Sequence, residues 1–513
     1  MQEGELKEIY RQAWQFVQKG QVKDALRLAL RLMDIDKNNP DGHFLLGLLY
    51  GRKGLTAKAK EHLSAAIGWK PDHALAYYYL ALILEQEGKL QEAIWALETA
   101  NWLMPNDEKI QKALSSLYER VEVRGFGSPP VITVSEQIPI FWRVSSTLYL
   151  LLLTIILIGF YALSFAIILA FFSGGALVGF WVFQKSLSIH LAVYVGGGLI
   201  FVGWLMLLGL LRPMLSVGEP VGVLKTSAEM PRLWRVLGEV AHRVGAQKPD
   251  EVLLVPSPTA AVIETGGLWG LPISTKRCLI LGVALLQWLT LTELKAVLAH
   301  ELAHFRHKDS AWVRFVHHVT ERLFQMIENV RHATRWWWIN PAYWLLSLYL
   351  WIYAIMAASF KRKREFWADR VAASAYGSEV YKSALEKVVD AQFFGEALSQ
   401  LFWDLVKFAK PLPNAFDALR QIRRSVDPVE VKRLRRDIWL YERRSIFATH
   451  PPLRERLARI QGVSGATDND PIPALIVFEE PKKVEEEVSR FFLQVTIALA
   501  SEYNDEVTVT RYL

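Results

Sequence analysis

An uncharged stretch from Val144 to Gln184 constrains this chain more than any other feature. Within it, residues 146–172 exceed the roughly 20 apolar residues that a helix needs to cross a bilayer. Residues 191–211 form a second uncharged run of adequate length. We therefore predict a transmembrane region at 144–212 with two helices. Core helices of a large soluble domain are the alternative, but paired uncharged runs flanked by Trp, Arg and Lys are rare there.

The charges around these runs carry a weak orientation signal. Arg143 and Arg212 lie outside the pair and Lys185 lies between the two runs, which slightly favours both ends in the cytoplasm. The first 30 residues lack the apolar core of a secretory signal. We expect an integral protein of the cell (inner) membrane whose soluble parts face the cytoplasm. A third crossing near residues 174–184 would instead place those parts on opposite sides.

Residues 1–122 contain an internal repeat. An offset of 34 residues relates three sets of small residues: Gly20, Gly54 and Gly88; Ala25, Ala59 and Ala93; Ala13, Gly47 and Ala81. Small residues let antiparallel helices approach closely, and a proline follows the second helix of each pair. The pattern resembles three tetratricopeptide repeats, followed by a linker at 123–143. Such solenoids usually bind a peptide or a partner protein, so we expect a ligand of this kind.

Composition narrows the classes of partner. Hydrophobic residues make up 52% of the chain, and the net charge is +7. The basic residues lie in short clusters near apolar stretches, so we expect the lipid bilayer, and no nucleic acid, as a partner. The single cysteine cannot form an internal disulfide, which suits a cytosolic face.

The segment from about residue 290 onwards has helical periodicity and contains the sequence HELAH. His300 and His304 lie four residues apart on one helical face, close enough to share a metal ion. Glu301 can reach a water on that metal. A surface helix is the alternative, but the small residues Ala299 and Ala303 favour a helix built into a core.

A catalytic zinc takes three protein ligands and keeps one position open, so a third ligand is needed from elsewhere. The segment 362–370 supplies Glu365 and, four residues on, Asp369. Glu365 can complete a His/His/Glu site for one zinc ion per chain. Asp369 can accept a hydrogen bond from the outer nitrogen of His300 and fix its tautomer. A solvated helix charge is the alternative for Glu365 alone.

Three ordered motifs carry a family resemblance: HELAH at 300–304, REFWAD at 364–369 and HPPLRERL at 450–457. Together they resemble the HtpX-type and CAAX prenyl protease-type family of membrane zinc metalloproteases. The resemblance covers residues 215–460 and implies a gluzincin-type domain, assigned to 213–463, that performs endoproteolysis at a membrane.

The same resemblance implies roles for individual residues. Zinc is held by His300, His304 and Glu365, and Glu301 is the general base. His450 and Arg456 steady the tetrahedral intermediate, or His450 regulates access to zinc. Relatives often carry a substrate-pairing strand with an Asn-Ala-Phe-like sequence. The corresponding stretch here is SPTAAVIET, residues 257–265.

Two further segments complete the interpretation. Residues 341–360 are apolar and long enough to span, but the only possible partner, 311–330, holds several charges. We expect a helix at 341–360 that is buried against the catalytic domain or dips into the lipid interface. Residues 464–513 are expected to be a C-terminal tail with a short strand at 474–478 and a helix near 483–501.

We thus expect a mainly α-helical chain: a tetratricopeptide solenoid, transmembrane helices, and an α+β gluzincin-type domain with a small sheet. The expected function is zinc-dependent hydrolysis of membrane or membrane-proximal polypeptides, with the repeats recruiting substrate or a partner. One alternative is a membrane-anchored repeat scaffold with an inactive protease fold, against which the intact Glu301 argues. Another is prenyl-protein processing, against which the few spans argue.

Overall fold

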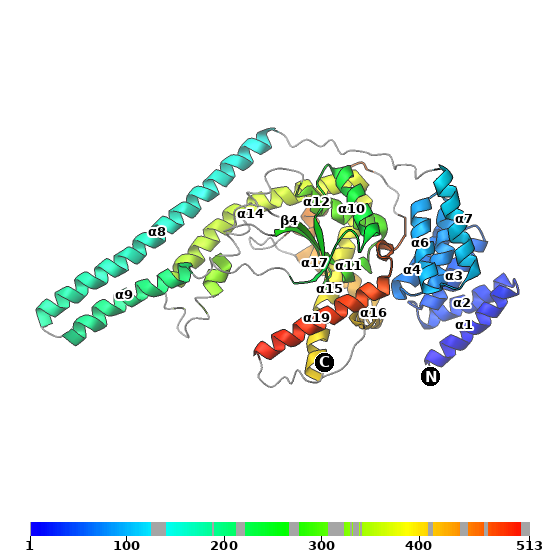
Figure 1. Ribbon diagram of the computed structural model, residues 1–513, viewed down its shortest axis with the longest axis horizontal. Helices are drawn as coiled ribbons and strands as arrows, with labels where there is room; N and C mark the ends of the chain where they lie inside the picture. The colour runs from blue at the N-terminus through cyan, green and yellow to red at the C-terminus, as the bar shows by residue number, and fades with distance from the viewer. Residues whose placement is uncertain are drawn as a thin grey trace.

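The computed structural model describes residues 2–124, 140–186, 189–211, 221–265, 276–305, 323–328, 331, 338, 341–408, 414–441, 450–465 and 470–503. Figure 1 shows three parts. A bundle of short helices lies at one end, a mixed α/β domain lies in the middle, and a long helical hairpin extends on the other side. The mainly helical fold with a small sheet confirms the predicted class.

The N-terminal module consists of three antiparallel helix pairs and a further helix. Their bounds are α1 (Gln2–Gln18), α2 (Val22–Ile35), α3 (Pro40–Arg52), α4 (Thr56–Trp69), α5 (Ala74–Gln86), α6 (Leu90–Leu103) and α7 (Glu108–Arg124). The glycines at the 34-residue offset lie in the turns inside the pairs, with φ of 73°, 74° and 78°. Only glycine adopts this conformation readily, so the repeated glycines fix the repeated turn. This arrangement confirms the predicted repeats.

Two apolar helices form the hairpin, α8 (Ile140–Ser186) and α9 (Ile189–Leu211). The expected end of the first helix near residue 172 is wrong, because α8 continues without a break to Ser186. The helices pack closely at glycines: a Cβ on Gly196 would lie 2.6 Å from the carbonyl oxygen of Gly175. Since no larger side chain fits at this crossing, the glycines in the middle of the apolar run mark a helix contact and not a turn.

One described helix is long and apolar enough to cross a membrane, the part of α8 from Thr154 to Lys185. A shorter apolar stretch, Ile189–Trp204, occupies the second predicted run. Another, Tyr343–Ile355, lies in α14 (Pro341–Tyr376). Apolar side chains along all three helices are exposed, among them Leu177 at 69% and Trp344 at 61%.

The run at 341–360 is the first half of the continuous helix α14. This run contacts α8, where the Tyr349 ring stacks on Phe160 with centroids 4.0 Å apart. The second half of α14 enters the mixed domain, so one continuous helix joins the apolar helices to that domain (Figure 1).

The mixed domain contains a four-stranded sheet with the order β1-β2-β4-β3. Its strands are β1 (Val223–Lys225), β2 (Glu251–Val255), β3 (Ala260–Thr265) and β4 (Lys276–Gly282). Strands β2 and β4 are parallel, whereas β1 and β3 pair antiparallel at the two edges. The helices between and after the strands are α10 (Pro231–Val244), α11 (Val283–Leu286) and α12 (Leu291–Ala303). Helix α12 packs against the edge strand β3.

The remaining elements close the domain around α12 and α14. They are α15 (Ser378–Phe408), α16 (Ala415–Ser425), α17 (Pro428–Tyr441), α18 (Leu453–Ile460), the 3-10 helix η3 (Ala474–Val477) and α19 (Pro481–Tyr503). The expected strand at 474–478 is wrong, because η3 occupies it. Residues 472–478 are almost fully buried, so this part of the predicted tail belongs to the core.

Candidate metal centre

Helix α12 begins with a capping box that fixes its first turn. The Thr290 side chain accepts a hydrogen bond from the backbone N–H of Glu293, and the Glu293 carboxylate accepts one from the backbone N–H of Thr290. Glu293 is fully buried and also receives 2.7 Å hydrogen bonds from Lys387 in α15. The capping box and the α15 contact therefore set the position of α12, which carries His300 in its last turn.

Three predicted ligand side chains meet where α12 ends beside α14. His300 Nε2 lies 3.4 Å from one Glu365 carboxylate oxygen, and His304 Nε2 lies 3.4 Å from the other. The two imidazole rings are 5.0 Å apart and nearly perpendicular, at 87°. Arg364 donates a 3.0 Å hydrogen bond to the carbonyl oxygen of His304, which joins the end of α12 to the turn of α14 that carries Glu365.

This donor set fits a zinc ion. Ligand atoms at about 2.1 Å from zinc in a tetrahedron lie about 3.4 Å from one another, which is the separation of both nitrogen–oxygen pairs. His300 Nε2 is buried and makes no hydrogen bond within the described residues. Since a buried polar atom without a partner is costly, an imidazole nitrogen of this kind beside a carboxylate is suited to bind a cation.

The electrostatics of the two imidazoles differ. Burial lowers the pKa of His304 to about 3, so its ring is neutral and offers a lone pair. Burial also disfavours the charged form of His300, but the Asp369 and Glu365 carboxylates outweigh it and raise the pKa of His300 to about 10. The negative potential that these carboxylates create at His300 equally favours a bound cation.

Asp369 lies behind His300, on the side away from Glu365. Its carboxylate is fully buried and 3.0 Å from His300 Nδ1. Burial by itself would raise the pKa of Asp369, but Arg456 and His300 lower it well below its usual range. An ionised carboxylate at Nδ1 holds the His300 ring so that Nε2 points at Glu365, as predicted for this pair.

Tyr381 is a member of this network that sequence reasoning missed. Its hydroxyl donates a 2.7 Å hydrogen bond to Asp369, and it lies 2.8 Å from His300 Nδ1. Tyr381 belongs to α15 and lies outside the three motifs, so no spacing signals it. The network therefore draws on a helix that carries none of the motif residues.

Arg456 lies in the network behind His300. Its guanidinium donates to both Asp369 oxygens, at 2.6 to 3.2 Å, and to the Tyr381 hydroxyl at 2.9 Å. The structure thus brings Arg456 to the carboxylate that holds His300, and not to the Glu365 side where a substrate would meet the metal. The expectation that Arg456 stabilises an intermediate finds no supporting contact among the described residues.

His450 lies on the other side of the centre, next to Glu365. Its Nδ1 is 2.6 Å from Glu365 Oε2, and 46% of its side chain is exposed. His300, Glu365 and His450 also form a cluster whose ligand atoms lie within 4.8 Å. However, 2.6 Å is a hydrogen-bond length and is too short for two ligands of one tetrahedral zinc. His304 lies outside this cluster, but its Nε2 is 3.4 Å from the other Glu365 oxygen, which is the separation expected of two zinc ligands.

Glu301 follows His300 directly on α12. Burial raises the pKa of its carboxyl, although His300 and His450 act in the opposite direction. A carboxyl with a raised pKa can accept a proton and release it again, which is the requirement for general acid and base work.

Comparison with known proteins agrees with these features. Residues 229–464 match the model of peptidase family M48, and residues 18–100 match the model of anaphase-promoting complex, cyclosome, subunit 3, which supports the repeat module. Annotated relatives include a protease HtpX homolog of Pyrobaculum aerophilum, 27% identical over 44% of this chain and 66% of that protein. Homologs from Pyrobaculum islandicum and Thiobacillus denitrificans are 25% and 27% identical, covering 52% and 51% of this chain and 80% and 83% of those proteins.

The match thus spans just under two thirds of the Pyrobaculum aerophilum protein and less than half of this chain. The motif-bearing helices α12, α14 and α18 all lie within the peptidase match. Residues 229–464 of the chain are thus similar to peptidase family M48, with HtpX protease homologs among the relatives, and a tetratricopeptide-like module precedes them at the N-terminus.

Proposed function

We propose that this chain is a membrane-bound, zinc-dependent endopeptidase in which His300, His304 and Glu365 hold one zinc ion. The observation that carries the proposal is the pair of 3.4 Å separations between the imidazole nitrogens and the two oxygens of Glu365. When bound, zinc supplies Lewis acidity, which makes water nucleophilic near neutral pH and polarises a peptide carbonyl.

The side chains of the chain itself supply the proton transfers and the positioning. Glu301 takes a proton from the attacking water and passes it to the leaving amine, because it is the carboxylate on α12 next to the metal face. His450 orients Glu365 through its 2.6 Å hydrogen bond. Asp369, Tyr381 and Arg456 keep the His300 ring in place from behind.

The polypeptide substrate binds in an extended form. Strand β3 is an edge strand, pairs only with β4 among the described strands, and packs against the metal helix α12. An added strand at such an edge is bound mainly through backbone groups, which tolerates many sequences. The segment 257–265, with its unusual sequence, is thus in the right place for substrate pairing.

The membrane supplies the substrate class. Helix α14 continues from the apolar stretch Tyr343–Ile355 to Glu365, which lies about 15 Å further along the helix. A metal centre this close to an apolar helix acts on membrane or membrane-proximal polypeptides. We place α8 and α9 in the cell (inner) membrane with the repeats and the metal centre in the cytoplasm.

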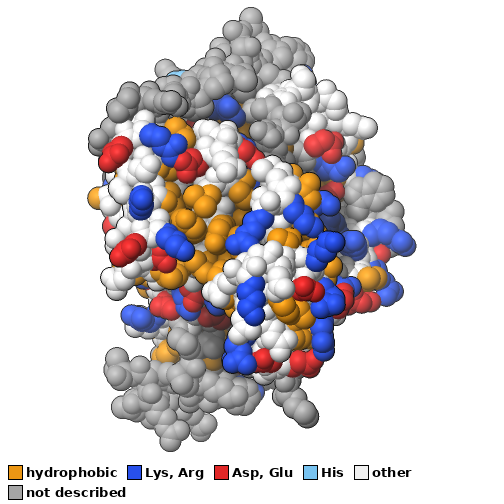
Figure 2. Space-filling model, turned by 90° about the vertical axis from the view of Figure 1, so that its right-hand side faces the viewer, with side chains coloured by type: hydrophobic (Ala, Val, Ile, Leu, Met, Phe, Trp, Pro, Cys, Tyr) orange, Lys and Arg blue, Asp and Glu red, His pale blue; other side chains and the backbone are white. Residues whose placement is uncertain are grey.

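The repeats recruit substrate or an adaptor protein. Viewed from the side of the repeats, Figure 2 shows apolar side chains gathered in the middle of this face, with basic and acidic side chains around them. Exposed apolar residues of the module include Leu30, Leu55 and Trp102. An apolar patch with a charged rim is the usual form of a protein-binding surface.

The test is cleavage of casein by the purified full chain in detergent, comparing the wild type with Glu301→Gln. Glu301→Gln should lower the rate by about 10²- to 10⁴-fold while the zinc content stays the same, because the base is lost and the ligands remain. Glu430→Gln is the matched control, since its carboxylate is 54% exposed on α17 and pairs only weakly, at 3.6 Å, with the exposed Arg433. Equal cleavage by the wild type and Glu301→Gln would show that Glu301 is not the general base. A wild type without cleavage would favour the scaffold alternative.

A further inference from the structure

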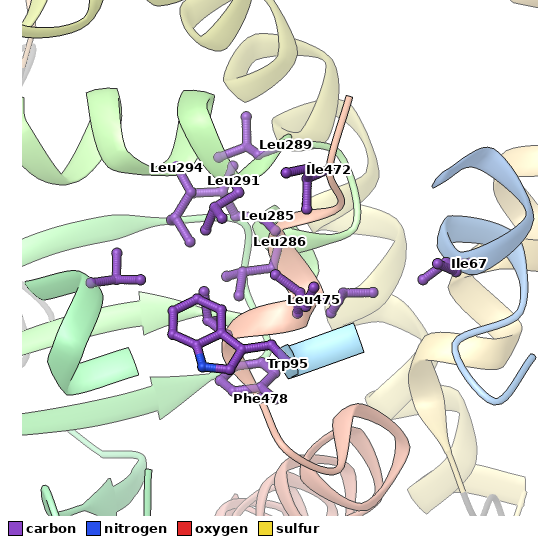
Figure 3. Packing of buried hydrophobic residues seen from close by; sticks show 14 of the residues in the cluster. Ile67, Trp95, Leu285, Leu286, Leu289, Leu291, Leu294, Ile472, Leu475 and Phe478 are labelled. Carbon is purple, nitrogen blue, oxygen red and sulfur yellow. The ribbon is translucent and has the colours of Figure 1, made fainter. Parts of the chain in front are cut away.

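The repeat module and the peptidase domain share one hydrophobic core. Figure 3 shows Trp95 of helix α6 against Phe478 and close to Leu475 of the segment 470–478. Trp95 is 5% exposed, and Phe478 and Leu475 are fully buried. The same cluster continues to Leu294 of the metal helix α12. The repeats are therefore packed firmly against the peptidase domain, because the second helices of the repeat pairs cover part of its hydrophobic core.

The segment 470–478 lies directly against the start of the metal helix. The backbone N–H of Leu291 donates a 2.7 Å hydrogen bond to the carbonyl oxygen of Ile472, and the N–H of Ala474 donates a 3.0 Å bond to Leu289. Thr290, the residue that caps α12, pairs with Pro473 in an isolated β-bridge. The segment 470–478 thus forms strand-like hydrogen bonds with the backbone that leads into α12 and holds it in place.

The repeats hold the first residue of that segment through charge. Asp470 forms ion pairs with Lys60 of α4 and with Lys89 at the start of α6. The side chains of Asp470 and Lys60 are each 8% exposed, and Lys60 also pairs with Glu87 at 2.6 Å. A buried carboxylate without its cations is strongly unfavourable, so Asp470 stays in this position only while the repeats remain docked.

A second buried cation ties the repeats to the far end of the segment. Arg232, which is 5% exposed at the start of α10, donates to the carbonyl oxygens of Ile476 and Phe478 at 3.3 Å. It also donates to Glu98 at 2.7 Å and to the Thr99 hydroxyl at 2.9 Å, both on α6. The segment is therefore fastened to the repeats at both of its ends.

We propose that Asp470 is a positioning residue of the metal centre: Lys60 and Lys89 of the repeats hold it, and through the segment 470–478 it fixes the start of the metal helix α12. His300 lies about 15 Å further along that helix. The repeat module then has a role besides recruitment, because its docked state sets where the imidazoles lie relative to Glu365.

The proposal is tested in the full chain by hydrogen–deuterium exchange and by zinc retention against a chelator, with Zn²⁺ as the only added metal. Asp470→Asn should accelerate amide exchange at residues 289–294 by about tenfold and weaken zinc retention less than the 10- to 100-fold typical of groups bonded to a ligand. Lys89→Gln is the milder variant, because Lys60 keeps its pair with Asp470, and should change exchange in the same residues by a smaller factor.

The matched control is Asp72→Asn. Asp72 pairs with Lys482 at 2.8 Å and so joins the repeats to α19 at the same interface, through a residue outside the segment 470–478. It should leave exchange at 289–294 unchanged. Unchanged exchange there in both Asp470→Asn and Lys89→Gln, or an equal acceleration in Asp72→Asn, would overturn the proposal. The zinc measurement rests on the proposed function, whereas the exchange measurement does not, so the two can fail separately.

Discussion

The metal centre and the repeat–peptidase interface are both built from buried charged groups, but the groups are arranged differently. At the interface, Lys60, Lys89, Glu87 and Asp470 pair with one another and their charges cancel. At the centre, ligand atoms of His300, Glu365 and His450 lie close together, and within the described part of the chain His300 Nε2 has no hydrogen-bond partner. A satisfied network holds a structure together, whereas an unsatisfied one of this kind marks a place for a ligand.

The largest expected effect is the loss of stability in Arg456→Met, which changes the network behind His300. It removes the three hydrogen bonds from Arg456 to the fully buried Asp369 and leaves that carboxylate without its guanidinium. Breaking a buried pair from one side costs about 3–5 kcal/mol of unfolding free energy. Chemical denaturation measures the loss. A change below about 1 kcal/mol would show that Asp369 is not held as the structure has it.

The next effect concerns zinc affinity, and it tests whether Asp369 positions the His300 ring for the metal. Asp369→Asn keeps the shape of the side chain but removes the charge beside His300 Nδ1, 3.0 Å away. Zinc affinity should fall by about 10- to 100-fold, since groups that bond a metal ligand typically contribute this much. Competition with a chromophoric chelator measures the affinity. Asp437→Asn, on helix α17, is a suitable control and should leave it unchanged.

The contact between Arg232 and Glu98 at the interface should give a smaller effect, on the free energy of unfolding. A double-mutant cycle of Arg232→Met and Glu98→Gln measures the coupling across their 2.7 Å contact. We expect about 1–2 kcal/mol in unfolding free energy, because Arg232 is buried while Glu98 is partly exposed. Zinc content should not change in either single variant. Loss of zinc in Glu98→Gln would show that this interface contact is needed for metal binding, against the difference drawn here between the interface and the metal centre.

The smallest effect concerns pH and lies within the repeats alone. Burial, and to a lesser degree the nearby His62, lowers the pKa of His43 from 6.5 to about 4. The unfolded chain therefore binds this proton more readily, and the stability that neutral His43 contributes is present above pH 6.5 and lost as the pH falls toward 4. We expect about 1 kcal/mol less unfolding free energy at pH 5 than at pH 7, and His43→Gln should flatten the dependence. An unchanged slope in that variant would show that other groups cause it.

The metal centre and the repeats could be predicted from the sequence, whereas the interface between the repeats and the peptidase domain could not. The metal residues lie in short local patterns, with His300 and His304 one helical turn apart and Glu365 one turn from Asp369, so helix geometry alone places each pair on one face. The repeats are visible in the sequence because the turn inside each helix pair requires a glycine, which recurs at a fixed spacing. Both features are encoded locally, and both could be predicted.

Contacts between distant residues could not be predicted. Asp470 pairs with Lys60 and Lys89, which lie about 400 residues away in the chain, and an isolated aspartate carries no signal of such a partner. Tyr381 joins Asp369 from a helix outside the motifs. The 3-10 helix at Ala474–Val477 looks like a strand in sequence because it is apolar and β-branched, and only its burial between α12 and the repeats decides its conformation.

The most direct test of the account is the metal content of the purified chain in four forms: wild type, Glu365→Ala, His304→Ala and His450→Ala. The geometry predicts about one zinc per chain in the wild type and in His450→Ala, and almost none in Glu365→Ala and His304→Ala. Glu365→Ala with a full complement of zinc, or a loss of zinc in His450→Ala but not in His304→Ala, would contradict the assigned ligand set.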